Sequence, residues 1–179
     1  RMMSMFLNEA TKLRAQTIIK GLEKRNMHGV FCATKEDALK QALSYIKEGS
    51  SVSWGGSMSV SEIGLMDALK EGNYHLIDRS VAKNFDEQRE IFSKAVLSDY
   101  FLMSSNAITL DGELINIDGT GNRVACLSYG PKHVIMIVGM NKVVNDVEDG
   151  IKRVRNFCQP SKHPSSRTEN PLFYDWTLW

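Results

Sequence analysis

Short apolar segments alternate with segments of helical length through most of this chain, and that alternation restricts the fold more than any other feature. Buried strands are predicted at residues 29–33, 51–54, 74–77, 100–104 and 132–138, because each apolar run is too short for a helix. Strands that alternate with helices form mostly parallel sheets with helices on both faces. The sequence therefore predicts an α/β domain of three layers, α/β/α, around a mostly parallel sheet.

Helical segments lie between these strands. They are expected over residues 4–26, 34–48, 59–70, 84–97 and 145–155, with another start near Thr120. Thr34 has Asp37 three residues later, the spacing of a capping box. Residues 108–117 are predicted to form a β-hairpin and not a helix, because two β-rich arms flank Asp111-Gly112. We expect one domain over residues 1–156 and an atypical C-terminal tail over residues 157–179.

The composition argues against several classes of protein. Lys plus Arg (22) nearly balances Asp plus Glu (21), so charge gives no reason to expect nucleic acid or a membrane as partner. The three cysteines, Cys32, Cys126 and Cys158, form no C-x-x-C motif, and we expect reduced thiols with no metal and no cofactor. No apolar run is long enough to span a bilayer, and the N-terminus has no apolar signal core. We therefore expect a cytoplasmic protein.

The turn after the strand at 51–54 is the first candidate site. Gly55, Gly56 and Ser57 stand between a strand and a helix, where ligands of open α/β sheets collect. Glycines there allow backbone N–H groups to point at an anion. The alternative is a plain turn in which Ser59 and Glu62 form a capping box, and for Glu62 the cap is the favoured role over an acid/base role.

The second candidate is the polar stretch at residues 116–123. Asn116 and Asp118 project from the same face of an extended segment. The segment continues with Gly119, Thr120 and Gly121, and then with Asn122 and Arg123 at a helix start. Loose amides, polar side chains and a guanidinium suit a phosphate or a carboxylate. The alternative is that Arg123 simply pairs with Asp118.

Two further positions complete the candidates. Asn141 and Lys142 follow the strand at 132–138, and they lie at the same sheet edge as Gly55 if the two strands are parallel. Asp99 directly precedes the strand at 100–104. It is a candidate general acid or base, although a carboxylate at a helix end is more often structural.

Taken together, seven motifs resemble the lactate-utilisation (LUD) domain family, and its LutC/YkgG-like members in particular. They occupy residues 54–57, 62–64, 106–109, 111–114, 116–123, 129–131 and 139–142, and the resemblance runs from about Leu7 to Asn156. It implies a fold of the NagB/RpiA/CoA-transferase-like superfamily. It also implies a link to bacterial L-lactate oxidation, in which such domains act beside iron–sulfur partner proteins.

A more distant likeness connects Asp99, residues 106–112 and residues 116–120 with methylthioribose-1-phosphate isomerases. In those enzymes an aspartate precedes a strand and an Asn-Gly-Thr segment lies beside the sugar phosphate. No counterpart of their cysteine is evident in this sequence. The likeness implies a sugar-phosphate isomerase-like enzyme as one alternative.

The leading hypothesis is a LUD-type protein that binds a small anionic metabolite, either a carboxylate, a sugar phosphate or a CoA ester. Gly55 to Ser57 would supply amides and a hydroxyl, and residues 119–122 the facing loop. Arg123 and Lys142 would supply positive charge, and Asp99 or Glu62 the acid or base. The rival hypothesis is a non-catalytic subunit that scaffolds an iron–sulfur lactate oxidase. The sequence leaves open whether the protein is an enzyme and whether it forms a homo-oligomer.

Overall fold

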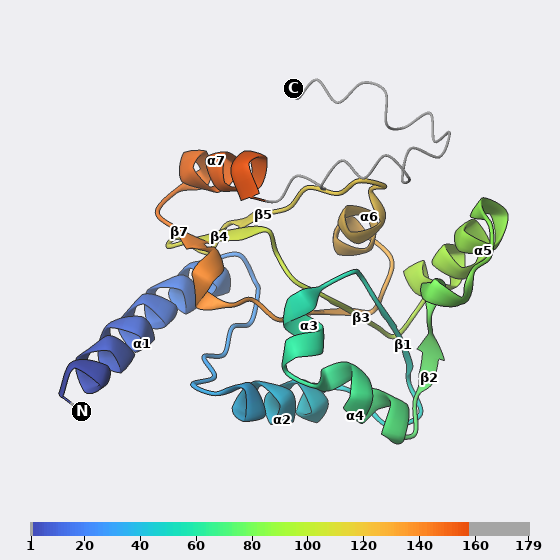
Figure 1. Cartoon of the computed structure of the whole chain (residues 1–179), viewed down its shortest axis with the longest axis horizontal. Coiled ribbons are helices and arrows are strands. Elements are labelled where there is room, and N and C mark those ends of the chain that lie inside the picture. The colour runs from blue at the N-terminus through green and yellow to red at the C-terminus, as the bar shows by residue number, and fades with distance from the viewer. Residues whose placement is uncertain (1, 158–179) are drawn as a thin grey trace.

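The centre of the molecule is a four-stranded parallel sheet, here called the main sheet. A computed structural model describes residues 2–157. The strands are β1 (Ser51–Trp54), β2 (His75–Ile77), β3 (Tyr100–Met103) and β6 (His133–Met136), in the order β2-β1-β3-β6. All neighbouring pairs are parallel, which confirms the prediction (Figure 1). Their carboxyl ends therefore lie along one edge, here called the carboxyl edge.

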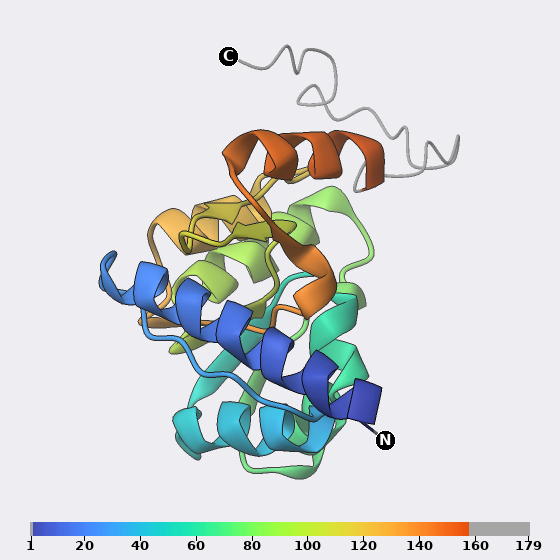
Figure 2. The ribbon, with the colours of Figure 1, turned by 90° about the vertical axis from the view of Figure 1, so that its left-hand side faces the viewer.

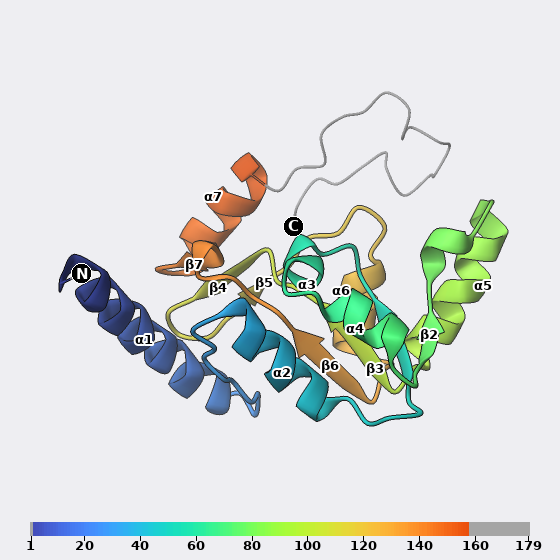
Figure 3. The ribbon, with the colours of Figure 1, turned by 60° about the horizontal axis from the view of Figure 1, so that its bottom comes forward.

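Helices cover both faces of the main sheet, as the alternating sequence predicted. One face carries α2 (Lys35–Tyr45), α3 (Met58–Glu62) and α4 (Leu65–Glu71), and the other carries α5 (Phe85–Val96) and α6 (Asn122–Ser128). Figure 3 shows α2 and α4 side by side in front of the sheet. Side chains alternate along β3, so Leu102 packs under the first group, whereas Phe101 and Met103 pack with Cys126 under the second. The fold is a three-layer α/β/α arrangement.

A small second sheet extends beyond the end of β3. It contains β4 (Ala107–Thr109), β5 (Leu114–Ile115) and β7 (Val143–Val144) in the order β5-β4-β7, with β4 and β5 antiparallel. The predicted hairpin turn is confirmed: the N–H of Gly112 donates to the carbonyl of Thr109 over 3.0 Å, and Gly112 has φ +78°. Helix α7 (Val147–Phe157) packs on this sheet, and α1 (Met2–Glu23) approaches the hairpin (Figure 2).

The strand predicted at residues 29–33 is wrong. Residues 27–32 connect α1 to α2 without entering either sheet. Gly29 instead lies against α1, where an added Cβ would be 3.0 Å from side-chain atoms of both Ile19 and Leu22. A strand requires a hydrogen-bonding neighbour, and the packing on α1 leaves this segment without one among the described residues.

Two local expectations also differ from the structure. The helix predicted over residues 59–70 is divided into α3 and α4 by Gly64, whose φ of +76° interrupts helical geometry. The capping box of Ser59 and Glu62 does not form. The N-cap of α3 is Ser57, whose Oγ accepts the N–H of Val60 over 3.4 Å. The cap at Thr34 is confirmed, because its Oγ1 accepts the N–H of Asp37 over 3.0 Å.

The remaining helix starts lie close to their predicted places, since α6 begins at Asn122 and α7 at Val147. Within residues 2–157, no helix combines the length and the apolar character required to cross a membrane. Of the tail predicted over residues 157–179, Phe157 is the last residue of α7, and residues 158–179 lie outside the described residues.

Candidate functional site

Several connections meet at the carboxyl edge of the main sheet. The N–H of Gly55, directly after β1, donates to the carbonyl of Leu102 in β3 over 2.9 Å. The ammonium of Lys142, from the short 3₁₀-helix η2 (Met140–Lys142) after β6, donates to Oγ of Ser104 over 2.6 Å and to Oγ of Ser59 over 3.1 Å. The structure therefore brings Gly55 and Lys142 to the same edge, as the parallel arrangement of strands requires.

Arg123 lies at this edge, but its guanidinium is turned inward and bonded to the protein. Nε donates to Oδ1 of Asp118 over 2.6 Å, and Nη1 donates to the carbonyl of Ser104 over 2.9 Å. Nη2 donates over 2.7 Å to both Oδ1 of Asn106 and the carbonyl of Ile117. Four of the five N–H donors of an arginine are thus used. Arg123 therefore pairs with Asp118, which was the alternative to a ligand-binding role. Its hydrogen bonds connect the segment after β3 to the loop before α6.

The two glycines after β1, Gly55 and Gly56, lie beside different arginine side chains. A Cβ added to Gly55 would lie 2.7 Å from Cγ and 2.9 Å from Cδ of Arg123, so this glycine makes room for the arginine stem. A Cβ added to Gly56 would lie 3.4 Å from Nη2 of Arg79. Gly56 therefore lies beside a second guanidinium, which the sequence reasoning missed.

Arg79 begins the short 3₁₀-helix η1 (Arg79–Val81), directly after β2. The turn is fixed by Asp78, whose Oδ1 accepts the N–H of Ser80 over 2.8 Å. The Arg79 side chain is half-buried, and it has no hydrogen bond or ion pair with any described residue. Burial raises the pKa of the Cys126 thiol to about 11, and the positive charge of Arg79 acts in the opposite direction. A signal did exist in the sequence, because the arginine follows a predicted strand of a parallel sheet.

A shallow pocket of about 450 Å³ opens at Gly56, within the size range of small-molecule sites, and Arg79 is not among the residues that line it. Its lining residues are Gly56, Ser57, Met58, Ser61 and Glu62. The carboxylate of Glu62 lies 3.8 Å from the ammonium of Lys35, and about half of the Glu62 side chain is exposed. Glu62 is thus the one predicted acid/base candidate that the structure places at this pocket.

Asp99 lies at the opposite edge of the main sheet. Its Oδ2 accepts the N–H of Ser51 over 2.8 Å and the Oγ–H of Ser51 over 2.7 Å, and its Oδ1 accepts a hydrogen bond from Lys132 over 2.7 Å. These bonds, the one from Lys132 first, hold the pKa of the Asp99 carboxyl well below its ordinary value. Because Asp99 precedes β3, it belongs to the amino ends of the strands, and the structure does not bring it to Gly55.

The other predicted positions are not among the residues that line the pocket at Gly56. Both amide atoms of Asn116 are buried and have no partner among the described residues. In the loop of Gly119 to Asn122, the hydroxyl of Thr120 donates to Oδ1 of Asn122 over 2.9 Å, and Gly121 is the left-handed N-cap of α6. Asn141 is exposed. Within the described chain, no three His, Cys, Asp or Glu side chains are arranged to hold a metal ion.

Comparison with known proteins identifies one family. The family described as the LUD domain matches residues 15–175. This match continues beyond Asn156, where the motifs indicated that the resemblance ends. No curated protein and no solved structure matches the chain.

Proposed function

The chain belongs to the LUD domain family, which links it to lactate utilisation, and we propose that it binds a small anionic metabolite at the carboxyl edge of its main sheet. The anion would lie beside the turn of Gly56 and Ser57, near the guanidinium of Arg79. Membership of the LutC/YkgG-like branch is part of this proposal.

The observation that carries the proposal is the state of Arg79. The guanidinium of Arg79 is open to solvent on a half-buried residue, and none of its N–H donors is bonded to a described residue. Arg123, at the same edge, has four of its donors bonded to the protein. Arg123 therefore has a structural role, whereas the guanidinium of Arg79 is available to bind a ligand with two anionic oxygens.

Neighbouring groups support the same chemistry. Gly56 keeps the space beside Nη2 of Arg79 open, and Lys142 places a second positive charge at the same edge. Carboxylates, sugar phosphates and CoA esters all offer anionic oxygens to such a site. If the bound metabolite reacts, Glu62 is the acid or base that we propose, because its carboxylate lines the pocket. The isomerase alternative that relies on Asp99 receives no support from the position of that residue.

A thermal-shift screen against L-lactate, pyruvate, inorganic phosphate, ribose 5-phosphate and acetyl-CoA tests the proposal. A ligand at 100 times its dissociation constant adds about 2.7 kcal/mol to the free energy of unfolding, a rise in Tm of roughly 5–10 °C for a domain of this size. We expect Arg79→Ala to abolish the shift. Arg89→Ala, which removes an exposed arginine of α5, is the matched control and should preserve it.

A shift that survives in Arg79→Ala would contradict the proposed place of the anion. If the wild-type protein shows no rise in Tm with any of the five compounds, the result would favour the rival hypothesis of a non-catalytic subunit. That hypothesis predicts association with iron–sulfur partner proteins, and co-purification of such a complex would support it.

A further inference from the structure

The connection between α1 and α2 is apolar and prone to β-structure, yet it pairs with no other segment of residues 2–157. Its sequence, Gly29-Val-Phe-Cys-Ala33, was the basis of the strand predicted there. None of the backbone N–H and carbonyl groups of residues 28–33 has a hydrogen-bond partner among the described residues. Val30 is 48% exposed, although valine favours buried strands. A strand-like sequence therefore has no neighbouring strand within the described part of the chain.

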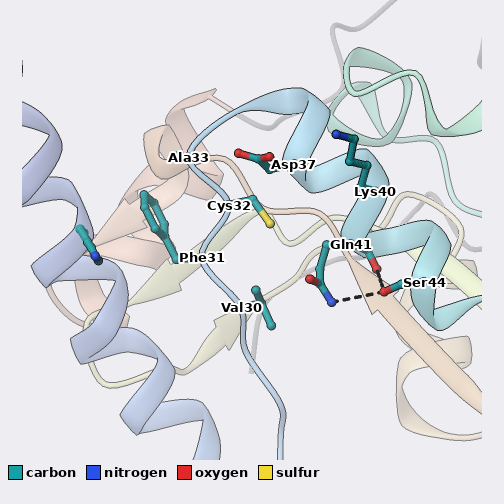
Figure 4. A pocket seen from close by; sticks show the side chains of 9 residues that line it. Val30, Phe31, Cys32, Ala33, Asp37, Lys40, Gln41 and Ser44 are labelled. Atoms are coloured by element: carbon teal, nitrogen blue, oxygen red, sulfur yellow. Dashed lines mark hydrogen bonds between the residues drawn. The ribbon is translucent and has the colours of Figure 1, made fainter.

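Most of this segment runs without a turn, and a bend begins only at Ala33. Residues 27–32 contain no turn and no bend. Figure 4 shows Phe31 on one side of the connection and Val30 and Cys32 on the other, which is the alternation of an extended chain. Pairing with another extended backbone would thus require little rearrangement of the segment.

A pocket of about 550 Å³ opens beside the segment, between the two helices. Its apolar wall is formed by Val30, Phe31, Cys32 and Ala33, and α2 contributes Asp37, Lys40, Gln41 and Ser44 (Figure 4). Strand addition uses backbone groups for affinity and an adjoining pocket for side chains. This segment offers such a pocket, together with backbone groups that bond to no described residue.

The charges at the pocket indicate the character of the occupant. Lys12 of α1 and Lys40 of α2 line it, and neither has an ion pair with a described residue. Asp37 is the one carboxylate of the lining, and its charge helps to raise the pKa of Cys32, after the larger effect of burial. The lining therefore carries one net positive charge, which a partner with one net negative charge would complement.

We propose that residues 28–33 accept an extended segment of a partner protein as an added β-strand, and that this segment is apolar with one net negative charge. The added strand of the partner would lie in the groove between α1 and α2. A small molecule would satisfy one or two backbone groups, whereas an extended peptide can pair with the series of groups along the segment. This surface is separate from the anion site at Gly56 and does not depend on the proposed function.

An array of acetylated, amidated hexapeptides provides the probe. Each peptide contains valine, leucine or phenylalanine at four positions, one aspartate or glutamate, and one serine for solubility. Binding to the full chain is measured by fluorescence anisotropy. We expect members of the array to bind with dissociation constants below about 1 mM, and the same peptides with lysine in place of the acid to bind at least about tenfold more weakly.

Two measurements separate strand pairing from a mere charge effect. Hydrogen exchange at the amides of residues 29–33 should slow when peptide binds, while exchange at α5 stays unchanged. Alternate residues of a strand face opposite neighbours. Of two peptides that are N-methylated at odd or at even positions, one should therefore lose binding and the other should keep it.

The charge is tested with Lys12→Glu/Lys40→Glu, which should weaken binding at least about tenfold. The matched control is Lys24→Glu/Lys47→Glu, which changes two exposed lysines just beyond the C-terminal ends of α1 and α2, and it should bind as wild type does. Absence of binding across the array, binding without slowed exchange at residues 29–33, or equal loss with the two methylated peptides would each overturn the proposal.

Discussion

Arg123 and Asp118 form an ion pair in which Nε lies 2.6 Å from Oδ1, and only 12% and 4% of the two side chains are exposed. The other oxygen of Asp118 accepts the N–H of Val124 over 2.7 Å, which anchors the first turn of α6. One ion pair thus joins the loop before α6 to the connection after β3.

Removing one partner of this pair should be strongly destabilising. Arg123→Ala leaves the buried carboxylate of Asp118 without its ion-pair partner and the carbonyl of Ser104 without its donor, and we expect a loss of about 3–5 kcal/mol in the free energy of unfolding. Urea denaturation checks this value. Arg123→Ala/Asp118→Asn removes the unpaired charge and should recover part of the loss. A loss below about 1 kcal/mol in the single variant would show that the pair is not structural.

Gly55 and Gly56 should respond differently to alanine. Gly55→Ala places a Cβ 2.7 Å from Cγ of Arg123, whose side chain is fixed by its hydrogen bonds, so we expect a loss of about 1–3 kcal/mol. Gly56→Ala places a Cβ 3.4 Å from Nη2 of Arg79, which can move. Its unfolding free energy should change by less than about 0.5 kcal/mol, while anion binding weakens. Equal destabilisation of both variants, measured in urea, would argue against this distinction.

Asp99 should make the stability depend on pH in the acid range. Its folded pKa is lowered by Lys132 and Ser51, so the carboxylate stabilises the fold at pH values above the ordinary carboxyl pKa of about 3.9. This contribution is lost progressively as the pH falls towards the folded pKa. Wild type should therefore exceed Asp99→Asn in stability at pH 7, and the difference should shrink below about pH 4.

Chemical denaturation of both proteins between pH 2.5 and pH 7 measures that difference. A difference that does not change with pH would mean that Asp99 contributes through hydrogen bonds alone.

Cys126 should be unreactive while the protein is folded. Its side chain is 1% exposed, and burial raises its pKa to about 11, so about one thiol in a thousand is ionised at pH 8. Cys32 is less buried and should react first. Thiol labelling in a Cys158→Ser background should show one fast group in the native protein and a second on unfolding. Rapid labelling of both native thiols would contradict the buried position of Cys126.

The order of elements and their local boundaries were accessible from the sequence. Alternation of apolar runs with helical segments predicted the parallel main sheet, Asp111-Gly112 predicted the hairpin, and Thr34 predicted a helix start. These signals are local, because periodicity, turn chemistry and capping depend on residues within about four positions of one another.

Part of the site was also within reach of sequence reasoning. Residues that follow parallel strands share an edge, and this rule placed Gly55 and Lys142 together. Applied consistently, the same rule would have included Arg79, which follows β2. It would also have excluded Asp99, which precedes β3.

Only the tertiary structure decided which of these groups form hydrogen bonds within the protein. No sequence spacing shows that Arg123 turns inward to Asp118, Ser104 and Asn106, whereas Arg79 keeps its donors free of described partners. Nor does any local pattern show that residues 29–33 have no neighbouring strand among residues 2–157. Both outcomes depend on contacts between segments that are distant in the chain. Hydrogen bonds and strand pairs form only where the packed fold brings two partners together, and the sequence near one partner does not specify the position of the other.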